Sequence, residues 1–157
     1  MRILFLSVGK TRTSWMREGI DVYADRLKHY CAFERNELSD IKQRAHLSVE
    51  QIKEQEGMML LKNVTSGDEV VLLDERGSLP SSESWAKQLE KKMIHGVPSV
   101  VFMAGGAYGF SPAVYDRANE LLALSRLTFS HQMVRLIFLE QLYRCFTIIK
   151  GEPYHHS

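Results

Sequence analysis

The sequence has few of the features that mark several classes of protein. It contains only two cysteines, Cys31 and Cys145, which are far apart and form no CxxC pair, so we expect reduced core thiols in a cytoplasmic protein. No apolar run approaches the roughly 20 residues that a membrane helix needs. The apolar segment ILFLSVG ends at Gly9 without a small-residue cleavage site, so we interpret it as a buried strand rather than a signal peptide.

The net charge is small, and familiar catalytic motifs are absent. The formal net charge of the 157 residues is +1, whereas dedicated nucleic-acid binders are usually strongly basic. There is no HExxH or paired-cysteine spacing, so we expect no metal site, and the absence of GxSxG leaves a serine nucleophile unsupported. Cations do gather in the last third of the chain, where an RNA-binding patch and an ordinary solvated helix face fit the spacing equally well.

Buried-strand patterns and helical periods alternate along the chain. This alternation predicts one α/β domain over residues 1–157, with a mostly parallel sheet and helices on both faces. The expected strands are 2–8, 31–38, 68–75 and 98–106, and the expected helices are 13–30, 48–64, 84–96, 111–122 and 131–151. Ser48 with Gln51 fits a capping box, Ser82 or Ser84 is the expected N-cap of its helix, and Gly151 is expected to end the last helix.

The expected last helix is apolar on more than one side, from Met133 to Ile149. A surface helix needs only one apolar stripe, so this helix requires two covering surfaces. We expect a second copy of the chain to provide one of them across a two-fold interface, which predicts a homodimer. A wholly internal helix is the alternative.

Two loops are candidates for binding a ligand. MAGGAYGFSP leads from a buried strand through Gly105, Gly106 and Gly109 into a helix start, at the strand end where open α/β sheets bind ligands. Its match to GxGxxG is imperfect, so both a nucleotide site and a plain tight turn remain open. LSRLTFSHQMVR carries polar residues with little regular period, and an ordinary connection is its alternative.

Several segments together resemble the RlmH family of SPOUT methyltransferases, which methylate N3 of a pseudouridine in large-subunit (23S) ribosomal RNA. The segments are ILFLSVGK, EVVLLDERG, FMAGGAYGFSP and LSRLTFSHQMVRLIFLEQLYRCFTIIKGEPYHH, so the likeness covers the whole length. Ser130 stands where a proline often precedes the histidine in that family. The resemblance implies a C-terminal trefoil knot, a homodimer, an assembled ribosome as substrate and S-adenosyl-L-methionine as cofactor.

The resemblance also implies which residues contact this cofactor. They follow a strand or belong to the two candidate loops: Leu73, Gly105, Leu124, Ser125, Arg126, Leu127, Thr128 and Phe129. Leucine and glycine supply apolar walls and accessible backbone, which suits an adenine and a methionine chain.

The tail GEPYHHS offers groups for proton transfer. Methyl transfer to an imide nitrogen requires removal of one proton, and a histidine with a pKa of about 6.5 can accept it near neutral pH. We assign this role to His155 and an orienting role to Tyr154; the two roles can be exchanged, and the tail can act in its own subunit or in its partner. The RNA contacts expected are Arg135, Arg144, Lys150 and His156. The alternatives are a disordered tail and a non-catalytic ribosome-binding dimer.

Overall fold

The computed structural model describes residues 1–154, and these residues alternate between strands and helices as the sequence predicts. The strands are β1 (Arg2–Val8), β2 (Ala32–Leu38), β3 (Glu69–Ser78), β4 (Ser99–Ala104) and β5 (Glu120–Leu122). The helices are α1 (Ser14–Leu27), α2 (Val49–Leu61), α3 (Ser82–Ile94), α4 (Pro112–Arg117) and α5 (Met133–Lys150), with a 3₁₀ turn at Arg44–His46.

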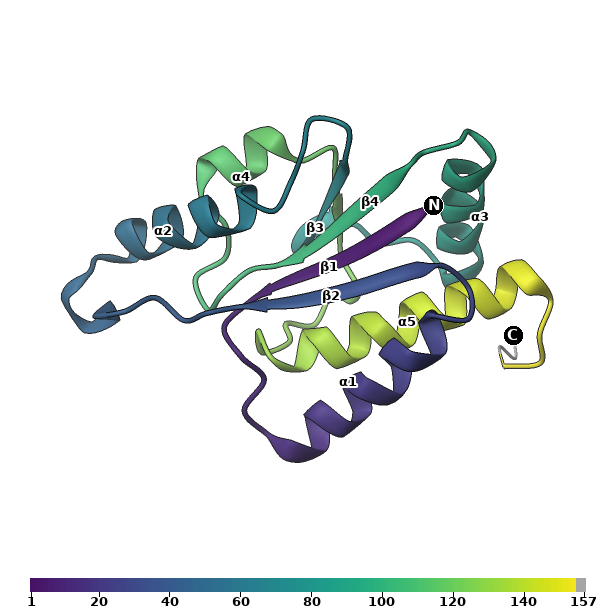
Figure 1. Cartoon of the computed structure of the whole chain (residues 1–157), viewed down its shortest axis with the longest axis horizontal. Helices are drawn as coiled ribbons and strands as arrows, with labels where there is room; N and C mark the ends of the chain where they lie inside the picture. The colour runs from purple at the N-terminus through teal and green to yellow at the C-terminus, as the bar shows by residue number, and fades with distance from the viewer. Residues whose placement is uncertain (155–157) are drawn as a thin grey trace.

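All five strands form one sheet in the order β2-β1-β4-β3-β5, and every neighbouring pair is parallel. The predicted α/β class with a parallel sheet is therefore confirmed. Helices α2 and α4 lie on one face of the sheet, and α1 and α5 lie on the other (Figure 1). Because the strands are parallel, their carboxyl ends meet at one edge of the sheet, where such folds bind ligands.

Side chains of the central strands alternate between two cores. Ile3 and Phe5 of β1 join the core under α1, α3 and α5, whereas Leu4 and Leu6 join the core under α2 and α4. The residues of β4 are all buried, and those from Val100 to Ala104 divide between the same two cores. Burial on both faces explains why these strands read as continuous apolar runs instead of an alternating pattern.

Helix ends follow the predicted caps in part. Ser48 and Gln51 form the expected capping box of α2, and Gly151 ends α5 in a left-handed conformation with φ of 66°. The N-cap of α3 is Ser81, not Ser82 or Ser84, because the Ser81 hydroxyl accepts the backbone N–H of Ser84. The expected helix over 111–122 is too long: α4 ends at Arg117, and 120–122 form the edge strand β5.

Helix α5 packs against α1 and α3 through one side. Phe138, Leu142 and Phe146 are buried on this side, and Phe138 stacks near Phe5 with ring centroids 4.7 Å apart. Other apolar residues of α5, including Ile137 and Ile149, are only half-buried within the single chain. These half-buried residues leave room for a second copy of the chain to cover them, and the homodimer stays a prediction. The trefoil knot also stays a prediction. Cys31 and Cys145 are free thiols, as predicted.

Candidate active site

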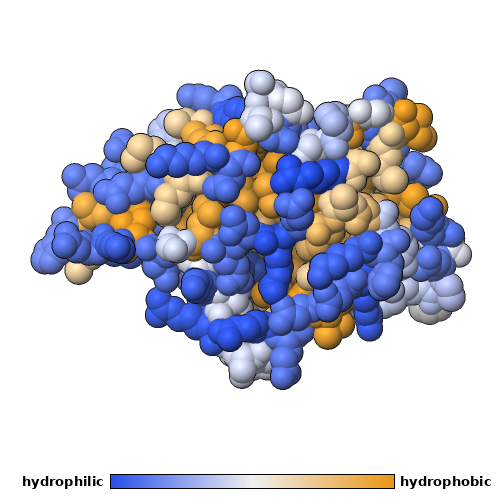
Figure 2. All heavy atoms as spheres, viewed as in Figure 1, coloured by the Kyte–Doolittle hydropathy of each residue, from blue (hydrophilic) through white to orange (hydrophobic). Residues whose placement is uncertain are grey.

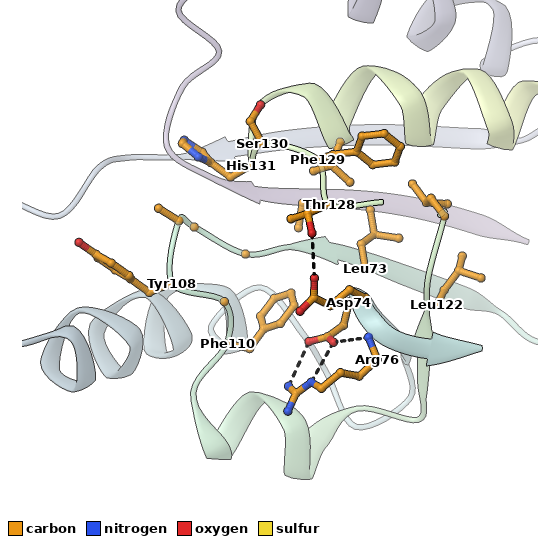
Figure 3. Close-up of a pocket in the computed structure, with 18 of the residues that line it drawn as sticks. Leu73, Asp74, Arg76, Tyr108, Phe110, Leu122, Thr128, Phe129, Ser130 and His131 are labelled. Carbon is orange, nitrogen blue, oxygen red and sulfur yellow. Dashed lines mark hydrogen bonds and ion pairs between the residues drawn. The ribbon is translucent and has the colours of Figure 1, made fainter. Parts of the chain in front are cut away.

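A cavity of about 650 Å³ opens at the carboxyl edge of the sheet. Its size lies within the range of about 300–1,000 Å³ that is usual for small-molecule sites. Four segments enclose it: the end of β3, the glycine loop 105–110, β5 with the residues after it, and the start of α5 (Figure 3). Its walls are largely apolar, with side chains that include Leu73, Phe110, Leu124 and Phe129.

The glycine loop makes a tight turn against a buried carboxylate. The backbone N–H of Gly109 donates to the carbonyl of Gly106 at 3.2 Å, and Gly109 has φ of 78°. A Cβ added to Gly106 would lie 2.5 Å from Oε2 of Glu56, so a side chain at this position would displace the loop or Glu56. Close approach to Glu56 thus favours glycine at position 106, and the left-handed backbone favours glycine at position 109.

Glu56 itself is 2% exposed, and neither carboxylate oxygen has a hydrogen-bond partner within residues 1–154. Its nearest counter-charge is Arg44, whose Nη1 lies 3.7 Å from Oε1. Burial raises the pKa of Glu56, although Arg44 acts in the opposite direction. The glycine loop thus packs against a buried carboxyl group whose charged form is disfavoured by the lack of solvent.

Acidic groups line the opposite side of the cavity. Asp74 receives hydrogen bonds from the backbone and guanidinium of Arg76 and from the hydroxyl of Tyr115. Burial acts to raise the pKa of Asp74, but the hydrogen bonds from Arg76 and Tyr115 outweigh it and keep that pKa below its usual value. Glu75 is exposed and accepts a hydrogen bond from the Thr128 hydroxyl at 3.4 Å. Arg76 lines the same side and offsets one of the two carboxylates, so this side keeps a net negative charge.

The 124–131 segment forms the remaining wall. The Ser125 hydroxyl accepts the backbone N–H of Leu127 at 2.9 Å, and the Ser130 hydroxyl accepts that of Met133 at 3.1 Å. Ser130 therefore helps to begin α5, which accounts physically for serine at a position where the resemblance expects proline. Burial lowers the pKa of the adjacent His131, and the guanidiniums of Arg135 and Arg44 lower it further.

Arg135 is the clearest correction to the predicted site. It was expected on an RNA-binding surface, but it is 1% exposed. Its guanidinium donates to the carbonyls of Val8, Gly9 and His131 and to the Thr11 hydroxyl, and it lies 3.7 Å from Glu37. These bonds fasten the start of α5 to the end of β1, so Arg135 holds the cavity wall in place and is not available to bind a phosphate.

Most residues expected to contact the cofactor do meet at the cavity. Those that line it are Leu73, Gly105, Leu124, Ser125, Leu127, Thr128 and Phe129. Arg126 is exposed and is not among the lining residues. The sequence alone gave no role to Asp74, Tyr115 or His131, which also line the cavity. The signal that could have found Asp74 is its position, because polar residues directly after a central strand face the ligand-binding edge.

Tyr154 lies at the other end of α5 from the cavity. Its hydroxyl is 3.2 Å from that of Tyr23 and donates to Glu140 at 3.1 Å, and Arg144 lies over its ring at 5.0 Å. Of the cavity residues, His131 precedes α5 and Val134 belongs to its first turn. The 18-residue helix between them and Tyr154 spans about 27 Å. Tyr154 therefore does not reach the cavity of its own chain.

The remaining predicted residues lie near Tyr154 or beyond the described chain. Arg144 donates to Glu140 at 2.6 Å, and Lys150 is exposed at the end of α5. His155 and His156 lie outside the described residues. Within residues 1–154, no three His, Cys, Asp or Glu side chains gather where they could hold a metal ion, and no helix has the length and apolarity to cross a membrane.

Comparison with known proteins assigns the family. The family model described as "Predicted SPOUT methyltransferase" matches residues 1–155. The chain is 50% identical to a protein of Parabacteroides distasonis over 100% of both chains, and 48% identical to one of Christiangramia forsetii over 99% of both. Both are named "Ribosomal RNA large subunit methyltransferase H". With a full-length family match and relatives at this identity, the chain belongs to the SPOUT methyltransferase family.

Proposed function

We propose that this protein transfers a methyl group from S-adenosylmethionine to N3 of a pseudouridine in large-subunit ribosomal RNA, on the assembled ribosome. The observation that carries the proposal is the cavity at the carboxyl edge of the sheet, which collects seven of the eight residues expected at the cofactor. The full-length relatives named as large-subunit rRNA methyltransferases support the same substrate class. They also favour catalysis over a purely ribosome-binding role.

The cavity residues fit the chemistry of this cofactor. S-adenosylmethionine, when bound, supplies a methyl group already activated on a sulfonium. Leu124, Phe110 and Phe129 provide apolar walls for an adenine ring, and the glycine loop exposes backbone at close range. Asp74 and Glu75 put negative charge on one side of the cavity, which suits a ligand that carries a cationic sulfonium.

The proton chemistry is assigned to the tail. N3 of the pseudouridine must lose its proton as the new N–C bond forms, and we assign His155 as the acceptor and Tyr154 as the group that orients it. Since Tyr154 lies about a helix length from its own cavity, the proposed site requires the tail of a second copy. The half-buried apolar residues of α5 supply a surface that such a copy could cover.

The direct test is transfer of labelled methyl from S-adenosylmethionine to purified ribosomes. We expect incorporation into ribosomes that contain the pseudouridine, and none into ribosomes with uridine at that position. His155→Ala should abolish transfer while the protein still binds S-adenosylmethionine in calorimetry. Equal incorporation into both kinds of ribosome, or none into either, would contradict the proposal.

A complementation experiment tests the shared site. One chain lacks the tail from Tyr154 onward, and the other carries Ser125→Trp, which fills the cavity. Each variant alone should be inactive, whereas a mixture should recover activity because one mixed site keeps both an intact cavity and an intact tail. A mixture that forms mixed dimers in native mass spectrometry but stays inactive would rule out a tail acting across the interface.

A further inference from the structure

Two loops at the mouth of the cavity carry exposed cations. Lys10 and Arg12 follow β1, and Lys42 and Arg44 follow β2. Because β1 and β2 are parallel neighbours, these loops leave the sheet at the same edge. Lys10, Arg12 and Lys42 are exposed, with 76% of the Arg12 side chain accessible. The Arg12 guanidinium lies 3.1 Å from the Asp40 carboxylate, and this single acid does not balance the cations of the two loops. Hydrophilic side chains predominate at this end of the molecule in Figure 2.

Contacts tie these loops to the cavity. The backbone N–H of Arg12 donates to the side chain of Gln132 at 3.3 Å. Gln132 is next in the sequence to His131, which lines the cavity. The guanidinium of Arg44 lies 5.2 Å from the ring centroid of Tyr108, which belongs to the glycine loop. The positive charges of Arg44 and Arg12 also reach His131, where both lower its pKa.

Tyr108 is more exposed, at 47%, than the other aromatic residues that line the cavity, which are Phe110, Tyr115 and Phe129. In Figure 3 its ring points away from the other labelled side chains, on the opposite side of the view from Arg76. A large aromatic ring held open to solvent beside a guanidinium is a suitable surface for stacking a nucleobase. The cavity mouth therefore has an aromatic and basic side, and an acidic side formed by Asp74 and Glu75.

We infer that the substrate RNA crosses the basic side of this mouth, with its phosphates against Arg12 and Arg44 and a base next to the target stacked on Tyr108. This inference rests on the proposed function. A base must leave its stack before an enzyme can act on it, so single-stranded or unstacked RNA must pass the mouth of the cavity. The side with Asp74, Glu75 and Arg76 has one more carboxylate than guanidinium, so the Arg12 and Arg44 side is the better match for phosphates. This surface replaces the predicted contribution of the buried Arg135.

Binding to purified assembled ribosomes at several potassium chloride concentrations tests the inference. Arg12→Ala with Arg44→Ala should weaken binding more than tenfold at low salt. The slope of log Kd against log salt should fall by about 0.7–0.9 for each phosphate contact removed. Lys87→Ala with Lys91→Ala removes two exposed cations from α3 and is the matched control. This control should bind with nearly the wild-type affinity and slope.

Stacking is tested separately at Tyr108. Tyr108→Ala should weaken binding to the ribosomes by about 5-fold to 100-fold, the range for losing one stacked base, whereas Tyr108→Phe should stay within a factor of about 3. Calorimetry with S-adenosylmethionine checks that the cavity is intact in the variant that carries both Arg12→Ala and Arg44→Ala. The inference is overturned if the double arginine variant keeps the wild-type affinity and slope, if the α3 control loses as much, or if Tyr108→Ala binds like Tyr108→Phe. In each case wild-type methyl transfer would still stand, so the failure would not be that of the proposed function.

Discussion

The two ends of α5 are built in different ways. At its amino end, Ser130, His131 and Arg135 join backbone from β1 and the 124–131 segment around an open cavity. At its carboxyl end, the half-buried Tyr154 contacts Tyr23, Tyr143 and Glu140, and none of these residues lines that cavity. A straight helix of about 27 Å separates the two ends. One chain thus holds a ligand cavity and a candidate catalytic tail that it cannot bring together itself.

The largest effect is expected from Arg135→Met. The change leaves the carbonyls of Val8 and Gly9 without their donor inside the protein, and it removes the positive charge next to Glu37. Removing one partner of a buried charged network costs about 3–5 kcal/mol. We expect a loss of that size in the free energy of unfolding, measured with urea.

Arg12→Ala is the matched control, because Arg12 belongs to the same end of the molecule but is exposed. Exposed substitutions usually change stability by less than about 0.5 kcal/mol. If Arg135→Met costs no more than Arg12→Ala, the amino end of α5 does not depend on this buried arginine.

Gly106→Ala should have the next largest effect, on ligand affinity. The new Cβ would meet the Glu56 carboxylate at 2.5 Å and push the loop out of place. We expect binding of S-adenosylmethionine to weaken by about tenfold, or about 1.4 kcal/mol, measured by calorimetry. Glu56→Ala in the same chain removes the obstruction and should restore part of the affinity.

Gly67→Ala serves as the comparison, since a Cβ there has no neighbour within 4 Å. It should bind the cofactor as the wild type does. Failure of Glu56→Ala to improve the Gly106→Ala protein would show that the collision with Glu56 is not the cause.

The sequence predicted the architecture well, because its signals are local. Apolar runs such as ILFLSV mark strands that are buried on both faces, and the Ser48 and Gln51 pair marks a helix start through hydrogen bonds within one turn. The 120–122 strand was missed because three residues carry too little period to separate strand from helix. The pairing of these residues with β3 is a long-range contact that no local pattern reports.

The site was predicted less evenly. Seven of the eight residues that the resemblance assigns to the cofactor line one cavity, but Arg135 was assigned to an RNA-binding surface because cations gather in the last third of the chain. Only the fold brings the carbonyls of Val8 and Gly9 to Arg135, more than 120 residues away in the chain. In the same way, an exposed tyrosine at position 108 and an arginine at position 44 have no relation in sequence until the loops meet.

Glu56 of α2, which lies under the glycine loop of the cavity, should make the stability of the folded protein depend on pH. Because burial raises its pKa above the ordinary 4.5, the folded protein holds the proton more tightly than the unfolded chain. Stability should therefore fall as the pH rises above about 4.5, and the fall should level off above the pKa that Glu56 has in the folded protein. Urea unfolding of wild type and Glu56→Gln from pH 4 to pH 8 measures this slope, which the variant should lose.

Arg44→Ala sharpens the same measurement. Arg44 lowers the pKa of Glu56, so its removal should extend the fall in stability to higher pH. Identical pH profiles for the wild type and Glu56→Gln would mean that Glu56 has the same pKa in the folded and unfolded states.

The smallest effect on folding is expected at the carboxyl end, from Tyr154→Phe. The ring packing against Tyr143, at 4.8 Å between centroids, is kept, and only the hydroxyl contacts with Tyr23 and Glu140 are lost. Each such hydrogen bond contributes about 0.5–1.5 kcal/mol, and partial exposure reduces that figure because water replaces the partner. We expect a loss of about 1 kcal/mol or less in urea unfolding, whereas methyl transfer should fall much further if the hydroxyl acts in a partner's cavity. A decrease in activity that only matches the loss of folded protein would leave Tyr154 as a packing residue of its own chain, and the two ends of α5 would then have no shared chemistry.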